Sequence, residues 1–100
     1  MVKEINTEEF RENIKKGRVV VDFFATWCGP CKMISPVIES ISTELDNISF
    51  YKVDVDKNED IAREYGIMSI PTIIIFEDGK VVNSIVGLKS RDELLEIIKG

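Results

Sequence analysis

The two cysteines of the chain, Cys28 and Cys31, are its most reactive side chains and lie three positions apart. On a tight turn, or on the first turn of a helix, side chains at positions i and i+3 are neighbours, so the two thiols can form a disulfide. A thiol pair that closes and reopens in this way exchanges electrons with other disulfides. The spacing therefore points to redox chemistry.

Two structural interpretations of the same pair are weaker. A structural disulfide stabilises mainly by restricting the unfolded chain, and this effect grows with loop length, so closing so short a loop gains little. A structural zinc site needs four ligands, mostly Cys and His, whereas the chain has two Cys and no His. We therefore favour redox function and expect neither a metal nor a cofactor.

The neighbouring residues suggest different roles for the two thiols. Gly29 permits a tight turn, and Pro30 fits the first helical positions, where its missing N–H is no loss. Cys28 would then lie at a helix N-terminus, where free backbone N–H groups and nearby Lys32 favour a thiolate. We predict Cys28 as the nucleophile and Cys31, one turn further in and less exposed, as the resolving thiol.

Composition limits the remaining possibilities. A chain of 100 residues with 44% hydrophobic and 31% charged residues is typical of one small soluble domain, here residues 1–100. The formal net charge of −5 and the lack of a basic stripe argue against binding to nucleic acid or to an anionic membrane. Because no apolar export segment or membrane span is present, we expect a cytoplasmic protein, in which a lone CxxC pair is more often catalytic than structural.

Hydrophobic periodicity and turn residues predict nine elements. An Asp-Gly pair at 78 and 79 between two apolar runs indicates a hairpin, and Ser90 with Glu93 forms a capping box. Pro36 should kink the helix that contains it. We predict strands at 2–5, 18–25, 48–55, 72–76 and 81–86, and helices at 7–17, 29–45, 58–65 and from 91 onward.

The order is βαβαβαββα, which indicates an α/β fold. Right-handed crossovers turn this order into a mixed sheet with helices on both faces. The run from 18 to 25 is so continuously apolar that we predict a central strand covered on both sides. The cysteine pair follows the carboxyl end of this strand, where sites in such sheets gather.

Two residues are ambiguous on pattern alone. Asp22 interrupts the apolar central strand, so it is either a satisfied structural carboxylate or a desolvated one with a raised pKa. Pro71 opens a strand, where proline is common, and nothing local indicates a cis bond before it.

The segment Val21-Asp22-Phe23-Phe24-Ala25-Thr26-Trp27-Cys28-Gly29-Pro30-Cys31-Lys32-Met33 closely resembles the active-site segment of thioredoxins, and Ser69-Ile70-Pro71-Thr72 resembles their second signature. The resemblance covers essentially the whole chain and implies the thioredoxin fold. It places Asp22 at the family's buried acid and Lys52 at its lysine neighbour. Asp22 would then take the proton from Cys31 through a water molecule during resolution.

The resemblance also implies a surface for clients. It predicts a cis Ile70-Pro71 bond facing the cysteines, with the Ile70 backbone free to pair with an extended client segment. We expect an apolar, nearly uncharged docking rim formed by Trp27, Gly29, Pro30, Ile70, Val86 and Gly87. Many family members carry Trp where this chain has Phe24, so Trp27 is its only indole.

We therefore expect a monomeric protein-disulfide reductase that reduces disulfides in client proteins and is re-reduced by a separate reductase. One alternative is an oxidase or isomerase of the disulfide isomerase type, but such proteins typically carry His where this chain has Pro30. The other alternative is a non-catalytic binding subunit that uses only the apolar rim.

Overall fold

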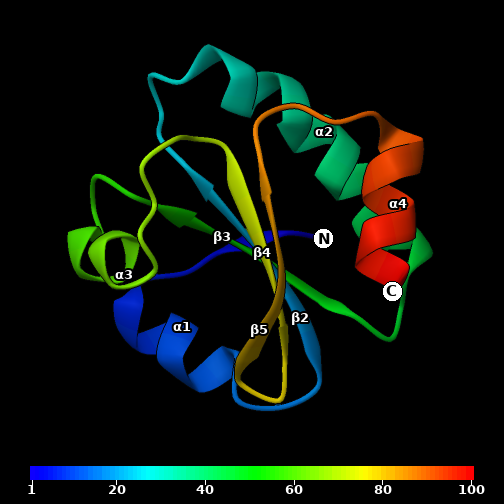
Figure 1. The fold of residues 1–100 in the computed structure, drawn as a ribbon, viewed down its shortest axis with the longest axis horizontal. Helices are drawn as coiled ribbons and strands as arrows, with labels where there is room; N and C mark the ends of the chain where they lie inside the picture. Colours follow the sequence, from blue (N-terminus) through cyan, green and yellow to red (C-terminus); the bar gives the residue numbers. More distant parts are fainter.

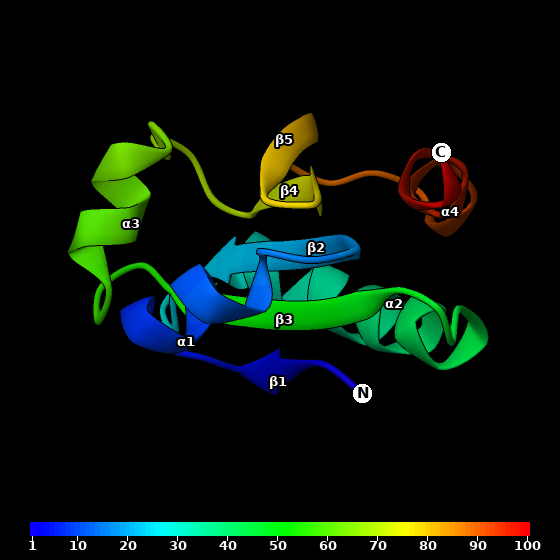
Figure 2. The same ribbon diagram turned by 90° about the horizontal axis from the view of Figure 1, so that it is seen from below.

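The computed structural model describes residues 1–100 and is built on a five-stranded sheet in the order β1-β3-β2-β4-β5 (Figure 1). In Figure 2 the strands follow one another from β5 at the top to β1 at the bottom. The predicted order βαβαβαββα is confirmed. The elements are β1 Lys3–Glu4, α1 Thr7–Asn13, β2 Arg18–Phe24, α2 Gly29–Glu44, β3 Ser49–Asp54, α3 Glu59–Glu64, β4 Thr72–Glu77, β5 Lys80–Val86 and α4 Arg91–Lys99.

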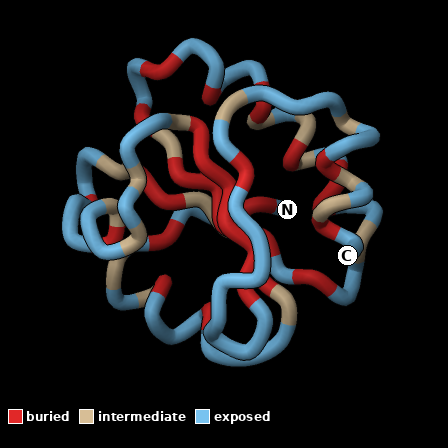
Figure 3. The backbone as a smooth tube through the Cα atoms, viewed as in Figure 1, coloured by how far each residue is buried: buried red, intermediate tan, exposed pale blue.

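Strand β2 is the middle of the sheet, as its apolar run predicted. It pairs in parallel with β3 and antiparallel with β4, so the sheet is mixed. Figure 3 shows buried backbone concentrated along these central strands, and residues 19–23 of β2 are all buried. Because β2 and β3 run in parallel, their carboxyl ends lie at the same edge of the sheet, where the cysteine segment begins.

The two faces of the sheet carry separate hydrophobic cores. Val20 contributes to the core that α2 and α4 cover, with Ile34 and Ile38 from α2 and Leu94 from α4. Val21 contributes to the opposite core, which α1 and α3 cover (Figure 1). Side chains alternate between the faces of a strand, so Asp22 shares the face of Val20 and is directed towards α2.

Most predicted boundaries agree with the structure to within a residue or two, but α1 is shorter than expected. It begins with the Asn6 and Glu9 capping box and ends at Asn13, whereas we predicted an end near Gly17. The backbone N–H of Gly17 donates to Asp78 Oδ1 at 2.8 Å, and the N–H of Asp78 donates back to the Gly17 carbonyl at 3.0 Å. These two bonds hold Gly17, at the end of the connection from α1 to β2, against the hairpin turn between β4 and β5. Helix α1 therefore ends before Gly17.

The hairpin and the last helix follow their sequence signals. Asp78 and Gly79 both have positive φ, 50° and 87°, as a two-residue hairpin turn requires. Ser90 and Glu93 form the predicted capping box of α4. Helix α2 continues past Pro36 to Glu44, and the kink at Pro36 stays a prediction. None of the helices is both long enough and apolar enough to span a bilayer.

Candidate active site

The cysteine segment lies between the end of β2 and the start of α2. The backbone N–H of Cys28 donates to the Ala25 carbonyl at 3.2 Å, which closes the turn after β2. Cys28 is the N-cap of α2, and its Sγ accepts a hydrogen bond from the backbone N–H of Cys31 at 3.2 Å. Pro30 occupies the first helical turn, as predicted. The backbone N–H of Cys31, which has no partner within the helix, therefore points at the Cys28 sulfur.

Cys28 and Cys31 form a disulfide, with their Cα atoms 5.3 Å apart. We predicted that Cys31 would be the less exposed of the two, and this prediction is wrong for the disulfide form, because each residue is 3% exposed. The reason is that both side chains pack together in one small cluster. Its other members are Ala25 and, at its margin, Phe24, Val55 and Ile70.

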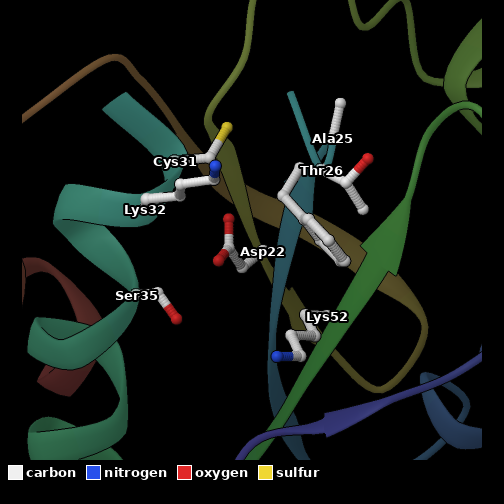
Figure 4. A pocket seen from close by; sticks show the side chains of 8 residues that line it. Asp22, Ala25, Thr26, Cys31, Lys32, Ser35 and Lys52 are labelled. Atoms are coloured by element: carbon white, nitrogen blue, oxygen red, sulfur yellow. The ribbon is translucent and has the colours of Figure 1, made fainter. Parts of the chain in front are cut away.

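A cavity of about 300 Å³ lies beside Cys31 (Figure 4). It is lined by Asp22, Phe24, Ala25, Thr26, Cys31, Lys32, Ser35 and Lys52. The structure thus brings together three of the predicted site residues, Asp22, Cys31 and Lys52, although they come from two strands and a helix. Figure 4 shows the Asp22 carboxylate directed into the space between α2 and the sheet, below the Cys31 sulfur.

Asp22 is a desolvated carboxylate rather than a satisfied one. Its side chain is 3% exposed, and its Oδ1 is buried without a hydrogen-bond partner. Burial raises the pKa of Asp22 from 3.8 to about 6, and the positive charge of Lys52 opposes this only in part. The carboxyl can therefore hold or release a proton close to neutral pH.

Lys52 lies beside Asp22, on the neighbouring strand. The two residues are directly paired in the parallel register of β2 and β3. They form no ion pair, since no lysine nitrogen lies within 4.0 Å of an Asp22 oxygen, and the Lys52 Nζ is instead 5.6 Å from the centroid of the Phe24 ring. Phe24 thus supports the lysine by a cation–π contact.

The second signature segment lies against the cysteines. The Ile70-Pro71 peptide bond is cis, as the resemblance implied. Cys28 Sγ is 3.8 Å from the carbonyl oxygen of Ile70, and the Pro71 carbonyl accepts a hydrogen bond from the N–H of Gly87 at 2.9 Å. Neither the N–H nor the carbonyl of Ile70 has a backbone partner.

The predicted rim residues differ in how much surface they offer. Trp27 is 69% exposed and Val86 is 58% exposed. Gly29 and Pro30 are also exposed, whereas Ile70 and Gly87 are half-buried. Pro71 is buried, so it shapes the surface from below rather than contributing area to it.

Sequence reasoning missed the polar residues of the turn after β3. The indole Nε1–H of Trp27 donates to Asp56 Oδ2 at 2.7 Å. Asp54 is 2% exposed, and its Oδ1 accepts from the backbone N–H of Asp56 at 2.9 Å. The signal that could have found them is a run of turn-forming residues at the end of β3, which is parallel to β2: Asp54 ends the strand, and Asp56 and Asn58 follow it. No three His, Cys, Asp or Glu side chains gather as metal ligands would.

Comparison with known proteins places this arrangement in a family. The family model described as Thioredoxin matches residues 1–100. A thioredoxin of Chlamydia trachomatis is 47% identical over 98 residues, covering 98% of this chain and 96% of that protein. A thioredoxin of Listeria monocytogenes is 46% identical over 99 residues, with the same coverage of 98% and 96%.

Solved structures agree with these relatives. The thioredoxin of Malassezia sympodialis has a TM-score of 0.90 at 42% identity, covering 98% of this chain and 90% of its own. The Plasmodium falciparum thioredoxin has a TM-score of 0.92 at 36% identity, covering 98% and 97%. Together with the bonded cysteine pair, these matches identify a thiol–disulfide oxidoreductase with protein-disulfide reductase activity. The chain belongs to the thioredoxin family.

Proposed function

We propose that Cys28 attacks client disulfides and that Cys31 resolves the mixed disulfide. The observation that carries this assignment is the hydrogen bond from the Cys31 N–H to Cys28 Sγ, 3.2 Å long, at the N-cap of α2. A thiolate at this position gains the same N–H and the positive end of the helix dipole. Cys31, inside the first turn, has neither advantage.

The reaction proceeds by two exchanges. The Cys28 thiolate attacks one sulfur of the client disulfide, which breaks that bond, forms a mixed disulfide and releases the first client thiolate. The Cys31 thiolate then attacks Cys28 Sγ, so that the Cys28–Cys31 disulfide forms and the second client sulfur leaves. Two electrons pass from the protein to the client. A reductase returns two electrons and two protons to close the cycle.

Asp22 is the proposed proton acceptor for Cys31, and Lys52 its electrostatic partner. Asp22 and Cys31 line the same cavity, and the pKa of the carboxyl, about 6, suits proton transfer near neutral pH. A water molecule in that cavity would carry the proton between them. With no histidine in the chain, no imidazole is available for this step.

Clients are proposed to dock on the apolar rim around Cys28. Its members are Trp27, Gly29, Pro30, Ile70, Val86 and Gly87, with Pro71 beneath them. The N–H and carbonyl of Ile70 have no backbone partner and lie close to Cys28, which supports pairing with an extended client segment. The rim would thus align a client disulfide with the Cys28 sulfur.

The general partners follow from family membership: a reductase and proteins that carry disulfides. We further propose that residues 1–100 act as one monomeric domain that carries electrons in the cytoplasm. A reductant of protein disulfides must itself be kept reduced, which favours a reducing compartment.

Serine variants of the two cysteines test the assignment. Cys31→Ser should attack once and stay bound to its client as a mixed disulfide, whereas Cys28→Ser should lose turnover and trap nothing. Thiol trapping followed by non-reducing gels separates these outcomes, with the double serine variant as the control. Capture by Cys28→Ser but not by Cys31→Ser would reverse the roles.

A further inference from the structure

The exposed indole of Trp27 is held by a carboxylate that does not belong to the rim. Trp27 precedes α2, whereas Asp56 lies in the turn between β3 and α3, and the Trp27 Nε1–H donates to Asp56 Oδ2 at 2.7 Å. Trp27 is 69% exposed, and this contact is the only hydrogen bond that its indole forms within the protein. Asp56 is therefore placed to decide how the largest rim side chain is presented.

The turn that carries Asp56 is fixed by its own hydrogen bonds. The Asp56 N–H donates to Asp54 Oδ1 at 2.9 Å, and Asn58 Nδ2 donates to the Asp54 carbonyl at 3.0 Å. Asn58 Oδ1 in turn accepts from the backbone N–H of Thr7 at 2.9 Å. Asp54 and Asn58 are both buried. The Asp56 carboxylate is thus presented from a turn that several hydrogen bonds hold in place.

Asp56 also carries a negative charge that forms no ion pair with a cation of the protein. It takes part in none of the ion pairs of the chain, and Lys57, next to it, forms none either. The rim residues themselves are uncharged. A client approaching Cys28 beside Trp27 therefore meets an aromatic face and, at its N–H edge, a carboxylate that accepts from the indole but forms no ion pair.

We propose that Trp27 and Asp56 together form a subsite for a cationic side chain of the client, and that Asp56 is its specificity-determining residue. The proposal rests on the docking role of Trp27 stated above. A Lys or Arg next to the client cysteine would lie over the indole and near the Asp56 carboxylate, while an Asp or Glu there would be repelled. Clients with basic residues beside the reactive disulfide are thereby favoured over acidic ones.

The expected preference is modest because the subsite is open to water. Exposed charge pairs contribute about 0.2–1 kcal/mol, which corresponds to about 1.4-fold to 5-fold. We therefore expect kcat/KM for a Lys-flanked disulfide to exceed that for a Glu-flanked one by about 3-fold to 5-fold at low ionic strength. The ratio should shrink towards unity at about 0.5 M salt, where exposed charges are screened.

Three disulfide peptides, identical except for Lys, Glu or Gln beside the attacked cysteine, test the proposal with the full chain. Asp56→Asn keeps an oxygen that accepts from the indole but removes the charge, whereas Asp56→Ala removes both. Asp60→Asn is the matched control, because it changes the net charge equally from an exposed position on α3. Fluorescence anisotropy of Trp27, the only tryptophan, reports how firmly the indole is held.

Asp56→Asn should lower the ratio of kcat/KM for the Lys peptide to that for the Glu peptide by at least 2-fold and leave the anisotropy of Trp27 unchanged. Asp56→Ala should lower both the ratio and the anisotropy. Asp60→Asn should change neither. An equal change of the ratio in Asp56→Asn and Asp60→Asn, or no change in either, would overturn the subsite. Unchanged anisotropy in Asp56→Ala would overturn the positioning of Trp27. The Gln peptide separates the subsite from the proposed function on which it rests. If the wild type reduces the Gln peptide as well as the Lys peptide, only the subsite fails. If the wild type reduces none of the peptides, the proposed function fails as well.

Discussion

Asp22 and Lys52 are directly paired across β2 and β3, yet their side chains form no ion pair. Lys52 is close enough to lower the pKa of Asp22, but burial raises it by more, to about 6. Full pairing would have held the carboxylate charged and removed it from proton transfer. The gap between the two groups thus leaves Asp22 able to change its protonation state at the working pH.

Replacing Asp22 by Asn should stabilise the fold at pH 8. The folded-state pKa, about 6, lies above the reference value of 3.8, so this group favours folding below about pH 4 and loses that benefit as pH rises through 6. The pKa difference corresponds to about 3 kcal/mol. Urea unfolding should therefore show Asp22→Asn about 3 kcal/mol more stable than wild type at pH 8 and nearly equal at pH 3.5.

The same variant should resolve mixed disulfides more slowly, because Cys31 loses its proton acceptor.

Asp54→Asn is the control for the stability prediction, since Asp54 is also buried but accepts a hydrogen bond from the Asp56 N–H. It should not gain stability at pH 8. Equal effects of Asp22→Asn at both pH values, or destabilisation at pH 8, would mean that Asp22 is well paired.

The sequence was sufficient for the fold because its local signals agree with one another. The apolar run of β2, the Asp78-Gly79 turn and the Ser90–Glu93 capping box each predicted an element that the structure contains. Where a boundary was wrong, at the end of α1, the cause was a contact between Gly17 and Asp78, which lie 61 positions apart. The hydrophobic periodicity of a segment carries no information about contacts with distant parts of the chain.

The site was predictable where chemistry is local and not where it depends on packing. The position of Cys28 at a helix N-terminus follows from Gly29 and Pro30, which adjoin it. The equal burial of the two cysteines depends on Val55 and Ile70, which reach them from other parts of the chain. The contact of Trp27 with Asp56 likewise joins two loops, so only the three-dimensional fold reveals it.

Arg18 should stabilise the chain through the end of α4. Its Nε donates to the Ile98 carbonyl at 2.7 Å, a second nitrogen donates to the Ile97 carbonyl at 3.3 Å, and a third lies 2.7 Å from Glu77 Oε1. These bonds satisfy terminal helix carbonyls with a positive charge. Arg18→Met, which keeps much of the aliphatic packing, should lower the free energy of unfolding by about 2 kcal/mol.

Urea unfolding at neutral pH measures this effect, and client reduction should be unchanged because Arg18 lies outside the site. Arg63→Met is the control, since Arg63 forms only an exposed 3.8 Å ion pair with Asp60 and should cost less than about 0.5 kcal/mol. If Arg18→Met cost no more than Arg63→Met, the carbonyl contacts would contribute nothing measurable.

Replacing Pro30 by His should make the protein a stronger oxidant while leaving the fold intact. Pro30 is exposed in the first turn of α2, between Cys28 and Cys31. An imidazolium there would stabilise the Cys28 thiolate beyond what the Cys31 N–H and the helix terminus provide. Stabilising the thiolate stabilises the reduced form, so the disulfide accepts electrons more readily and the reduction potential becomes less negative.

One partly exposed charge should shift the potential by about 30–60 mV, since about 30 mV corresponds to about 1.4 kcal/mol for a two-electron couple. Equilibration against glutathione buffers, followed by the fluorescence of Trp27, gives the potentials of wild type and variant. Pro30→Ala controls for the lost rigidity of proline, and the difference between the His and Ala variants should fall as pH rises above the imidazole pKa, about 6.5. A potential of Pro30→His equal to or more negative than that of Pro30→Ala would show that charge at this position does not set the reducing power of the cysteine pair.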